Sequence, residues 1–257
     1  STQAKTLFPY TTLFRSGLPT NMPEFTVDFP DVALVPIVSS AKALKILNKR
    51  WEGRYKRVPD AVIVEGPLSG GHQGVQFEDC CKEEYQLENL VPEVVEEAKK
   101  WGKIPIIAAG GIWDNSDIKK FMALGADGVQ MGTRFIATRE CDAPEAFKQM
   151  LVEAKEEDIV LMKSPVGYPA RGVRSELLRK IEAKTAPDVK CISNCVIPCH
   201  QGVEAKAVGY CIADRLADAA FGDLSNGLYF SGSNGYRVEK IVSVEELMRE
   251  LTADDNS

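Results

Sequence analysis

The stretch of sequence that decides the fold is IPIIAAGGIWDNSDIKKFMALGADGVQMGTRF, residues 104–135. It opens with the short apolar run 104–109, which is typical of a buried strand in a parallel sheet. Residues 117–124 follow with apolar side chains at helical spacing, and residues 128–131 form a second short strand. This order of elements predicts one β-α-β unit, in which a helix joins two parallel strands.

Glycines stand at the carboxyl end of both predicted strands, as Gly110–Gly111 and as Gly132. Glycine lets the backbone turn sharply and approach a ligand, because no Cβ stands in the way. Asn115 or Ser116 is expected to cap the intervening helix. Bare amide groups and a helix amino end attract phosphate, and (β/α)₈ barrels hold phosphate at this place. The alternative is an ordinary buried unit whose glycines only make turns.

Two further strands precede this unit, at residues 32–38 and 61–64, and helices follow them at 41–48 and 88–101. Each connection carries a helix, so the strands are expected to be parallel with right-handed crossovers. Four strands are half of the eight that close a barrel. The predicted fold class is therefore α/β, the carboxyl-terminal half of a TIM (β/α)₈ barrel; a complete four-stranded open sheet is the alternative.

The first sixteen residues do not resemble a natural protein segment. Residues 6–16, TLFPYTTLFRS, resemble the in-frame translation of a sequencing-adapter oligonucleotide. Residues 1–16 are therefore predicted to be an artefactual tail, with an unusual natural tail as the alternative. On this interpretation the natural sequence begins near Gly17, in mid-protein, and residues 17–140 form the half-barrel.

Beyond residue 140 the pattern changes to helices and irregular loops, and residues 141–257 are expected to form a helical appendage over the barrel mouth. The predicted helices cover residues 145–155, 173–184, 203–221 and 243–251, and a loop covers 164–171. The last helix opens with Ser243 and Glu246, which are expected to form a capping box.

The composition limits the classes of function. At 257 residues, with 44% hydrophobic and 26% charged residues, the chain has the composition of a soluble globular protein with a large core. The formal net charge of −6 and the lack of a basic stripe argue against a nucleic-acid partner. No apolar run suits a membrane span and no signal peptide is seen. Seven cysteines, an odd number, favour reduced thiols and a cytoplasmic protein.

Three of the cysteines, Cys191, Cys195 and Cys199, stand four residues apart, with His200 adjacent. Pro198 argues against a helix that would align their thiols on one face. Zinc or an iron–sulfur cluster is one interpretation, but the paired CxxC spacing of ordinary zinc sites is missing. Reduced thiols without a metal are therefore predicted.

Only two histidines occur, and His72 is the candidate catalytic residue. It follows the predicted strand 61–64 in the run EGPLSGGHQG, on the side where barrel enzymes place their catalytic groups. Gly70 and Gly71 let the backbone pass close to a flat ligand. A histidine there can act as base, acid or hydrogen-bond donor near neutral pH. The alternative is a loop histidine in water, and His200 is expected to be structural or exposed.

Three motifs, in this order, resemble the nitronate monooxygenase family, once called 2-nitropropane dioxygenases, which also includes flavin-dependent enoyl-ACP reductases. The motifs are DAVIVEGPLSGGHQG at residues 60–74, IIAAGGI at 106–112 and GADGVQMGTRF at 125–135. The likeness extends from about Gly17 to the end, and Gly17-Leu18-Pro19 resembles the end of the family's fourth barrel strand.

The resemblance implies an enzyme that binds FMN, with the flavin phosphate at the ends of the seventh and eighth barrel strands. His72 matches the family's active-site histidine, which deprotonates a nitroalkane or assists its anion. The resemblance further implies that O₂ oxidises the nitronate to a carbonyl compound and nitrite, and a homodimer is one assembly to expect. The cofactor-binding residues that it implies are Gly70, Gly71, Gly110, Gly111, Gln130, Gly132 and Thr133, with no metal.

The sequence departs from the family pattern in two places. Pro67-Leu-Ser69-Gly-Gly-His stands where the family has Glu-Ala-Gly-Gly-His, and the family's flavin-binding loop after the first strand is absent. Without that loop one wall of the flavin site is missing, so this chain is expected to be inactive although its parent protein is an enzyme. The loops around Arg171 and Asn234 are interpreted as ordinary surface loops, with loops that cover the flavin and define the substrate pocket as the alternative hypothesis.

The leading prediction is FMN-dependent oxidation of a small nitronate or nitroalkane by O₂. An FMN- and NADH-dependent enoyl-ACP reductase is the alternative within the family, and an inactive truncated fragment is the alternative outside it. A sugar-phosphate enzyme would explain the glycines between residues 110 and 133 but would leave His72 without a role.

Overall fold

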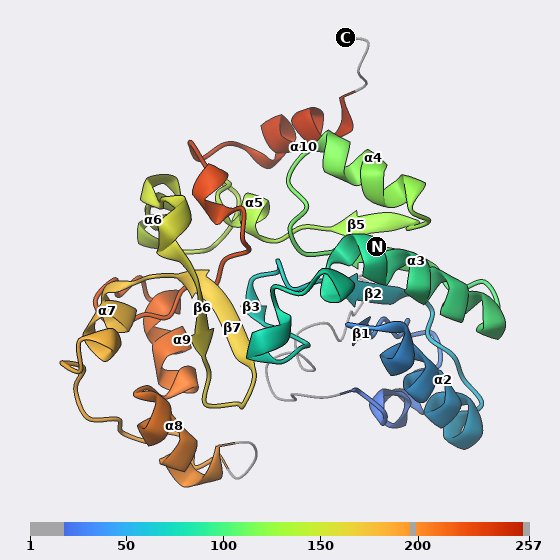
Figure 1. Ribbon diagram of the computed structural model, residues 1–257, viewed down its shortest axis with the longest axis horizontal. Coiled ribbons are helices and arrows are strands. Elements are labelled where there is room, and N and C mark those ends of the chain that lie inside the picture. The colour runs from blue at the N-terminus through green and yellow to red at the C-terminus, as the bar shows by residue number, and fades with distance from the viewer. Residues whose placement is uncertain (1–17, 196–198, 254–257) are drawn as a thin grey trace.

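A computed structural model of the chain describes residues 18–195 and 199–253. The predictions made for residues 1–16, Gly17 and Pro198 lie outside the described residues. Figure 1 shows a sheet with helices beside it on one side of the molecule, and a smaller sheet with further helices on the other. The protein is a mixed α/β protein with a parallel sheet, which confirms the predicted class.

The larger sheet has four parallel strands, which follow one another in space in the order of the chain. The strands are β1 (Ile37–Val38), β2 (Val62–Glu65), β4 (Ile106–Ala109) and β5 (Gly128–Gln130). Strand β1 is much shorter than the predicted run 32–38, because only its last two residues pair with β2.

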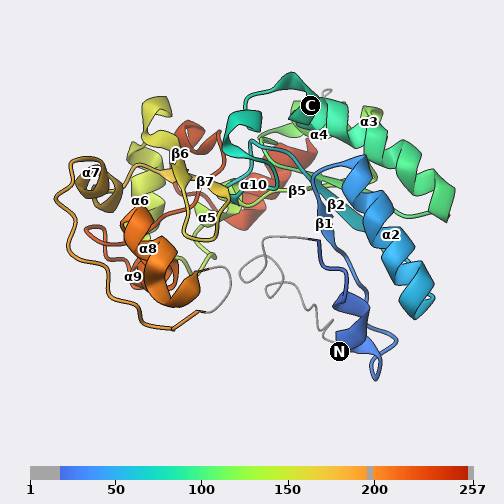
Figure 2. The ribbon, with the colours of Figure 1, turned by 60° about the horizontal axis from the view of Figure 1, so that its bottom comes forward.

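Three helices connect these strands: α2 (Ala41–Tyr55), α3 (Leu87–Ala98), which continues as a 3₁₀ turn (Lys99–Trp101), and α4 (Asn115–Ala123). Their apolar faces pack on the same side of the sheet (Figure 2). Consecutive strands of a β/α barrel have this arrangement, because right-handed crossovers place every helix on the outer face. Closure into an eight-stranded barrel stays a prediction.

Helix α4 begins with a different cap from the one predicted. The Asp114 carboxylate accepts a hydrogen bond from the Asp117 amide at 3.1 Å, whereas Asn115 and Ser116 lie inside the helix. The prediction of Asn115 or Ser116 as the cap is therefore wrong by one or two residues. The cause is that the carboxylate one position earlier accepts a hydrogen bond from an amide of the first turn, which has no partner within the helix. It also complements the positive end of the helix dipole.

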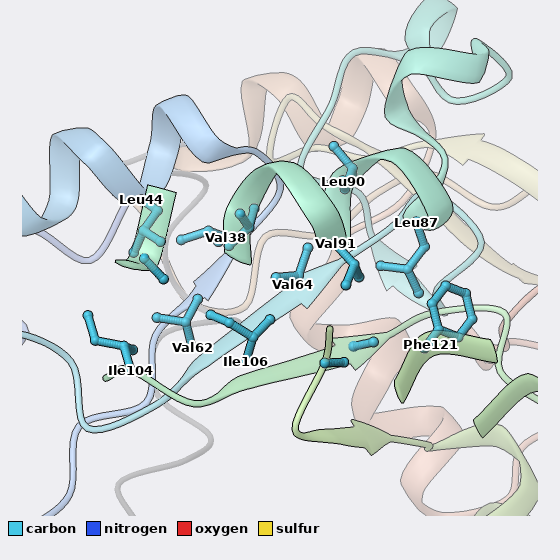
Figure 3. Close-up of a cluster of buried hydrophobic side chains, with 14 of the residues drawn as sticks. Val38, Leu44, Val62, Val64, Leu87, Leu90, Val91, Ile104, Ile106 and Phe121 are labelled. Atoms are coloured by element: carbon cyan, nitrogen blue, oxygen red, sulfur yellow. The ribbon is translucent and has the colours of Figure 1, made fainter. Parts of the chain in front are cut away.

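The main hydrophobic core lies between the sheet and these helices (Figure 3). Alternate strand residues, Val62 and Val64 in β2 and Ala108 in β4, point into it and are fully buried. Helix α3 contributes its apolar stripe, with Leu90 and Val91 buried. The apolar residues that recur at helical spacing in the sequence therefore form the face that holds this layer of the fold together.

The smaller sheet is antiparallel and was not predicted. It consists of β3 (Gly71–His72), β7 (Pro169–Val173) and β6 (Ile159–Lys163), in that order in space. The predicted loop 164–171 and helix 173–184 are wrong in part, because residues 169–173 form a strand and helix α7 covers only Glu176–Glu182. The run Pro-Ala-Arg-Gly-Val is poor in strand-forming residues, and it becomes a strand because it pairs with partners on both sides.

The remaining helices are α5 (Thr133–Ile136), α6 (Glu145–Glu153), α8 (Val203–Val208), α9 (Ile212–Ala220) and α10 (Val244–Thr252). The predicted helix 203–221 is interrupted between α8 and α9, where Gly209 has a φ of +99° and ends the first of the two helices. Short 3₁₀ turns cover Met22–Thr26, Phe77–Asp79, Glu83–Tyr85, Glu156–Asp158, His200–Gly202 and Gly235–Arg237. Among the described residues, none of the helices has the length and apolar character needed to cross a membrane.

Helix α10 returns the carboxyl end of the chain to the parallel sheet. Ser243 and Glu246 form the predicted capping box at its start, which confirms that prediction. Near its end, Arg134 of α5 makes a two-pronged ion pair with Glu250, at 2.8 and 2.9 Å, and donates to the Trp113 carbonyl oxygen. The segment that follows the small sheet is thereby fastened to the loop after β4.

Candidate functional site

His72 lies in strand β3, at the edge of the small sheet. It pairs with Ala170 of β7, and its side chain is half-buried. The Nε2 atom is 2.8 Å from the Ser164 hydroxyl oxygen, and the ring meets Phe230 edge-on with the ring centroids 5.5 Å apart. The imidazole is therefore held by a buried hydroxyl and an aromatic ring, unlike a loop histidine surrounded by water.

The protonation of His72 follows from this setting. Burial lowers the pKa of His72 below its ordinary value, because the charged imidazolium is poorly solvated there. The ring is therefore neutral near pH 7 and can accept a proton. Ser164 also accepts a hydrogen bond from the Val166 amide, at 3.4 Å, which helps to fix the hydroxyl against the ring.

The double-glycine turn after β4 packs directly against the loop that leads to His72. Gly110 and Gly111 have φ values of +99° and +80°, in the region that favours glycine. A Cβ at Gly110 would lie 2.9 Å from the Gly66 carbonyl oxygen, and one at Gly111 would lie 2.9 Å from Leu68 Cβ. The structure thus brings the first two sequence motifs into contact, at the carboxyl edge of the parallel sheet.

A third segment, residues 230–234, bridges these motifs. The Ser233 amide donates to the Leu68 carbonyl oxygen at 3.0 Å, and the Asn234 side chain donates to the Gly111 carbonyl oxygen at 2.7 Å. The Gly232 amide donates to the Thr133 hydroxyl oxygen at 2.9 Å. Thr133, predicted to contact a phosphate, therefore already accepts a bond from the chain, although its hydroxyl proton is free to donate to a ligand.

The predicted cofactor glycines differ in how much space surrounds their backbone. Within the part of the chain that the structure describes, the amides of Gly110, Gly111 and Gly132 donate no hydrogen bond to another group of the protein. A Cβ at Gly132 would meet no atom within 4 Å, so the backbone there is open. A Cβ at Gly70 would lie 2.7 Å from the Ser231 carbonyl carbon. The backbone is therefore open at Gly132 and closely packed at Gly70, as it is at Gly110 and Gly111.

Strand β2 ends in a titratable residue that sequence reasoning missed. Burial raises the pKa of the Glu65 carboxyl group to about 7, and the Ser69 side chain acts in the opposite direction. Glu65 pairs with Ala109 and Ala109 pairs with Gln130, so all three lie at one level at the end of the sheet. The sequence does contain a signal for this residue. An acidic side chain ends the apolar run Val-Ile-Val, directly before Gly66.

Arg171 and Asn234, for which a role over the flavin is the alternative hypothesis, act within the structure as ties between loops. Arg171 lies opposite Gly71 in the ladder, so its side chain leaves the small sheet on the face opposite to His72. Its guanidinium donates to the Pro67 carbonyl oxygen at 2.9 Å. Both residues fasten the 66–72 loop or the double-glycine turn, and a role over a flavin stays a hypothesis.

The cysteines are all free thiols, and no group of three potential metal ligands occurs among residues 18–195 and 199–253. Cys191 and Cys195 lie in an irregular segment rather than on a helix face. The Cys195 sulfur is 2.9 Å from the Ser193 hydroxyl. His200 is exposed and hydrogen-bonded to Glu204 at 2.5 Å, in keeping with the structural or exposed position expected for it.

Comparison with known sequences gives a consistent result. The model of the family described as nitronate monooxygenase matches residues 8–254. A probable nitronate monooxygenase of Staphylococcus saprophyticus is 38% identical over 125 residues, which are 48% of this chain and 34% of the relative. Another, of Staphylococcus aureus strain JH9, is 35% identical over 167 residues, 61% of this chain and 44% of the relative. The chain therefore spans less than half the length of these relatives.

Solved structures resemble the chain over most of its length. FabK from Thermotoga maritima superimposes with a TM-score of 0.66 at 28% identity, covering 91% of this chain and 64% of that one. A nitroalkane oxidase from Streptomyces ansochromogenes superimposes with a TM-score of 0.61 at 25% identity, covering 86% and 57%.

The fold and the site define an α/β protein in which the loop leading to a half-buried histidine packs against a glycine turn at the carboxyl edge of a parallel sheet, where such proteins bind ligands. The match over residues 8–254 identifies it further: the chain belongs to the nitronate monooxygenase family.

Proposed function

We propose that the site binds FMN and serves the oxidation of alkyl nitronates or nitroalkanes by O₂ to carbonyl compounds and nitrite. The observation that carries the proposal is the contact between the His72 loop and the double-glycine turn, where Gly66 and Leu68 touch Gly110 and Gly111. The loop that leads to the candidate base thus packs against glycines whose amides have no protein partner within the described residues.

The residues present fit a phosphate-bearing cofactor. Three glycines, Gly110, Gly111 and Gly132, have amides without partners within the described residues, and such amides suit a dianionic phosphate. The open backbone at Gly132 and the Thr133 hydroxyl extend the same edge. Gln130 is exposed at the end of β5, beside them. Gly71 lies next to His72, where a flat ring system would pass.

FMN held by these residues would supply the electron acceptor for oxidation of the substrate by O₂. The chain's own contribution is proton transfer, since His72 is neutral near pH 7 and can remove the acidic proton next to a nitro group. Ser164 holds the ring in position from one side, at 2.8 Å, and Phe230 holds it from another.

A flavin titration of the purified chain tests this function. We expect FMN fluorescence to be quenched stoichiometrically, and nitrite to form when a nitroalkane and O₂ are added. The competing expectation, an inactive fragment that lacks one wall of the site, predicts neither result. A chain that quenches no flavin at any concentration contradicts the proposed function.

An FMN- and NADH-dependent enoyl-ACP reductase is the second candidate, as a member of the same family. The superposition on FabK, with a TM-score of 0.66, is the observation that favours it. Stopped-flow mixing of the flavin-loaded protein with NADH distinguishes the two, because rapid bleaching of the flavin by NADH supports the reductase and its absence supports the oxygenase.

A further inference from the structure

The Ser164 hydroxyl group joins His72 to a buried tyrosine. Ser164 follows directly after β6, is buried, and has its oxygen 2.8 Å from Nε2 of His72. Tyr210 lies in the turn between α8 and α9 and is also buried. Its side chain forms a hydrogen bond with that of Ser164. Three side chains from segments far apart in the sequence therefore form one continuous series of hydrogen bonds, from His72 through Ser164 to Tyr210.

The direction of these hydrogen bonds follows from where each proton can go. The Tyr210 hydroxyl donates to the Lys163 carbonyl oxygen at 2.7 Å, and a carbonyl oxygen can only accept. Burial raises the pKa of Tyr210, so the hydroxyl keeps its proton at neutral pH. The proton between the two hydroxyl oxygens must then come from Ser164, which has only one to donate. The Ser164 oxygen is left to accept a hydrogen bond from Nε2 of His72.

This arrangement determines which ring nitrogen of His72 is basic. A neutral imidazole with its proton on Nε2 carries its free lone pair on Nδ1. Burial lowers the pKa of His72, so the ring is neutral near pH 7. Within the described residues, the His72 side chain forms its hydrogen bond through Nε2, and Nδ1 has no protein partner. The lone pair of Nδ1 is therefore available to a ligand.

We propose that Ser164 and Tyr210 are positioning residues that hold His72 in the Nε2–H tautomer, so that Nδ1 is the atom that accepts the proton of the substrate. The assignment of the tautomer rests on the geometry of these three side chains alone. The assignment of Nδ1 as the base rests in addition on the proposed function, because it assumes that the substrate loses a proton to His72.

The test is nuclear magnetic resonance of the ring nitrogens in a tag-free chain with isotope-labelled histidine, at about pH 8, where the imidazole is neutral. Protonated and unprotonated ring nitrogens have well-separated chemical shifts, so the tautomer is observed directly and no flavin is needed. His200→Gln removes the signals of the other histidine and thereby assigns those of His72. We expect Nε2 to be the protonated nitrogen in the unaltered chain.

Tyr210→Phe is the variant that tests the direction of the hydrogen bonds. It removes the oxygen that accepts from Ser164, so the Ser164 hydroxyl can donate to Nε2 and the ring proton should move to Nδ1. Tyr229→Phe is the matched control, because Tyr229 is also buried but its hydroxyl has no hydrogen-bond partner within the described residues. This control should leave the tautomer unchanged.

Ser164→Ala gives a second measurement that does not depend on the folding of Tyr210→Phe. It removes the hydroxyl that holds Nε2, so the ring nitrogens should show the intermediate chemical shifts of a mixture of tautomers. A proton on Nδ1 in the unaltered chain overturns the proposal. A ring that stays purely in the Nε2–H form in Tyr210→Phe or in Ser164→Ala overturns it as well.

Activity measurements separate this inference from the proposed function. In the FMN-loaded chain, Tyr210→Phe should lower kcat/KM for a nitroalkane by about tenfold or more, because the reacting nitrogen then carries the proton. A preformed nitronate should be nearly unaffected. Equal losses with both substrates, or no loss with either, overturn the assignment of Nδ1 as the base. An unaltered chain that shows the expected tautomer but forms no nitrite contradicts the proposed function and leaves the assignment of the tautomer standing.

Discussion

In the proposed function, the His72 imidazole is needed as a base for only one of two forms of the substrate. A neutral nitroalkane must lose a proton, whereas a nitronate already carries the negative charge. His72→Ala should therefore lower nitrite formation from a nitroalkane by about 10²- to 10⁴-fold, the usual contribution of a general base. Nitrite formation from a preformed nitronate should change much less. Steady-state assays with both substrates measure the difference, and equal losses would contradict a role as base.

The lowered pKa of His72 has a consequence for the pH profile. The base works when it is neutral, so activity on a nitroalkane should rise with pH through an inflection below the ordinary histidine value. A profile of kcat/KM against pH checks this for the unaltered chain. An inflection above the ordinary pKa of histidine would mean that burial does not control the pKa of His72.

Two glycines show how differently the same residue type acts in this chain. Gly110→Ala places a Cβ 2.9 Å from the Gly66 carbonyl oxygen at a φ of +99°, so we expect a loss of at least about 2 kcal/mol in unfolding free energy. Gly53 is exposed within α2, and a Cβ there meets nothing within 4 Å. Gly53→Ala should therefore stabilise the chain by about 0.5–1 kcal/mol. Urea denaturation measures both, and a harmless Gly110→Ala would refute the tight packing of the turn.

At the scale of elements, the cap of α10 is one that the sequence identified correctly. Ser243→Ala removes the side-chain oxygen that accepts from the Glu246 amide at 3.0 Å, and should cost about 1 kcal/mol. Ser243→Asp keeps an acceptor in the same place and should cost little. Thermal denaturation of both variants checks this, and equal stability of the two would show that the capping box does not stabilise the helix.

The strand at residues 169–173 was missed for a physical reason. Helix α3 and strands β2 and β4 carry their own pattern, because apolar residues recur at the spacing of one buried face. Residues 169–173 carry no such pattern, and they form a strand only because β3 and β6 offer hydrogen-bonding edges. Pairing between β3 and β7, about 100 residues apart, leaves no local signal, whereas β6 and β7 form a hairpin and the apolar run of β6 was a local strand signal that the sequence analysis missed.

At the scale of the whole molecule, one cluster fastens the carboxyl end to the parallel sheet. The Arg134 side chain is only 11% exposed, binds Glu250 with two hydrogen bonds, and lies over the Trp113 ring at 4.6 Å. Arg134→Lys loses the paired geometry and the stacking, and should cost about 1 kcal/mol. Amide hydrogen exchange should then show α10 opening more often.

Arg139→Lys is the matched control for this prediction. Arg139 pairs with Glu246 at 3.0 Å, and both side chains are more than half exposed, so the change should have almost no effect. If exchange in α10 increases equally in both variants, the cluster around Trp113 does not fasten the helix.

The sequence by itself determined the parallel strands, their connecting helices and the identity of the candidate groups, because each depends on residues that are neighbours in the chain. His72 and the glycines at 110, 111 and 132 were found in this way. Only the tertiary structure decided that the His72 loop rests on the double-glycine turn and that residues 230–234 bridge them. It also decided that the pKa of the Glu65 carboxyl group is raised to about 7, since that pKa depends on the burial that distant segments create.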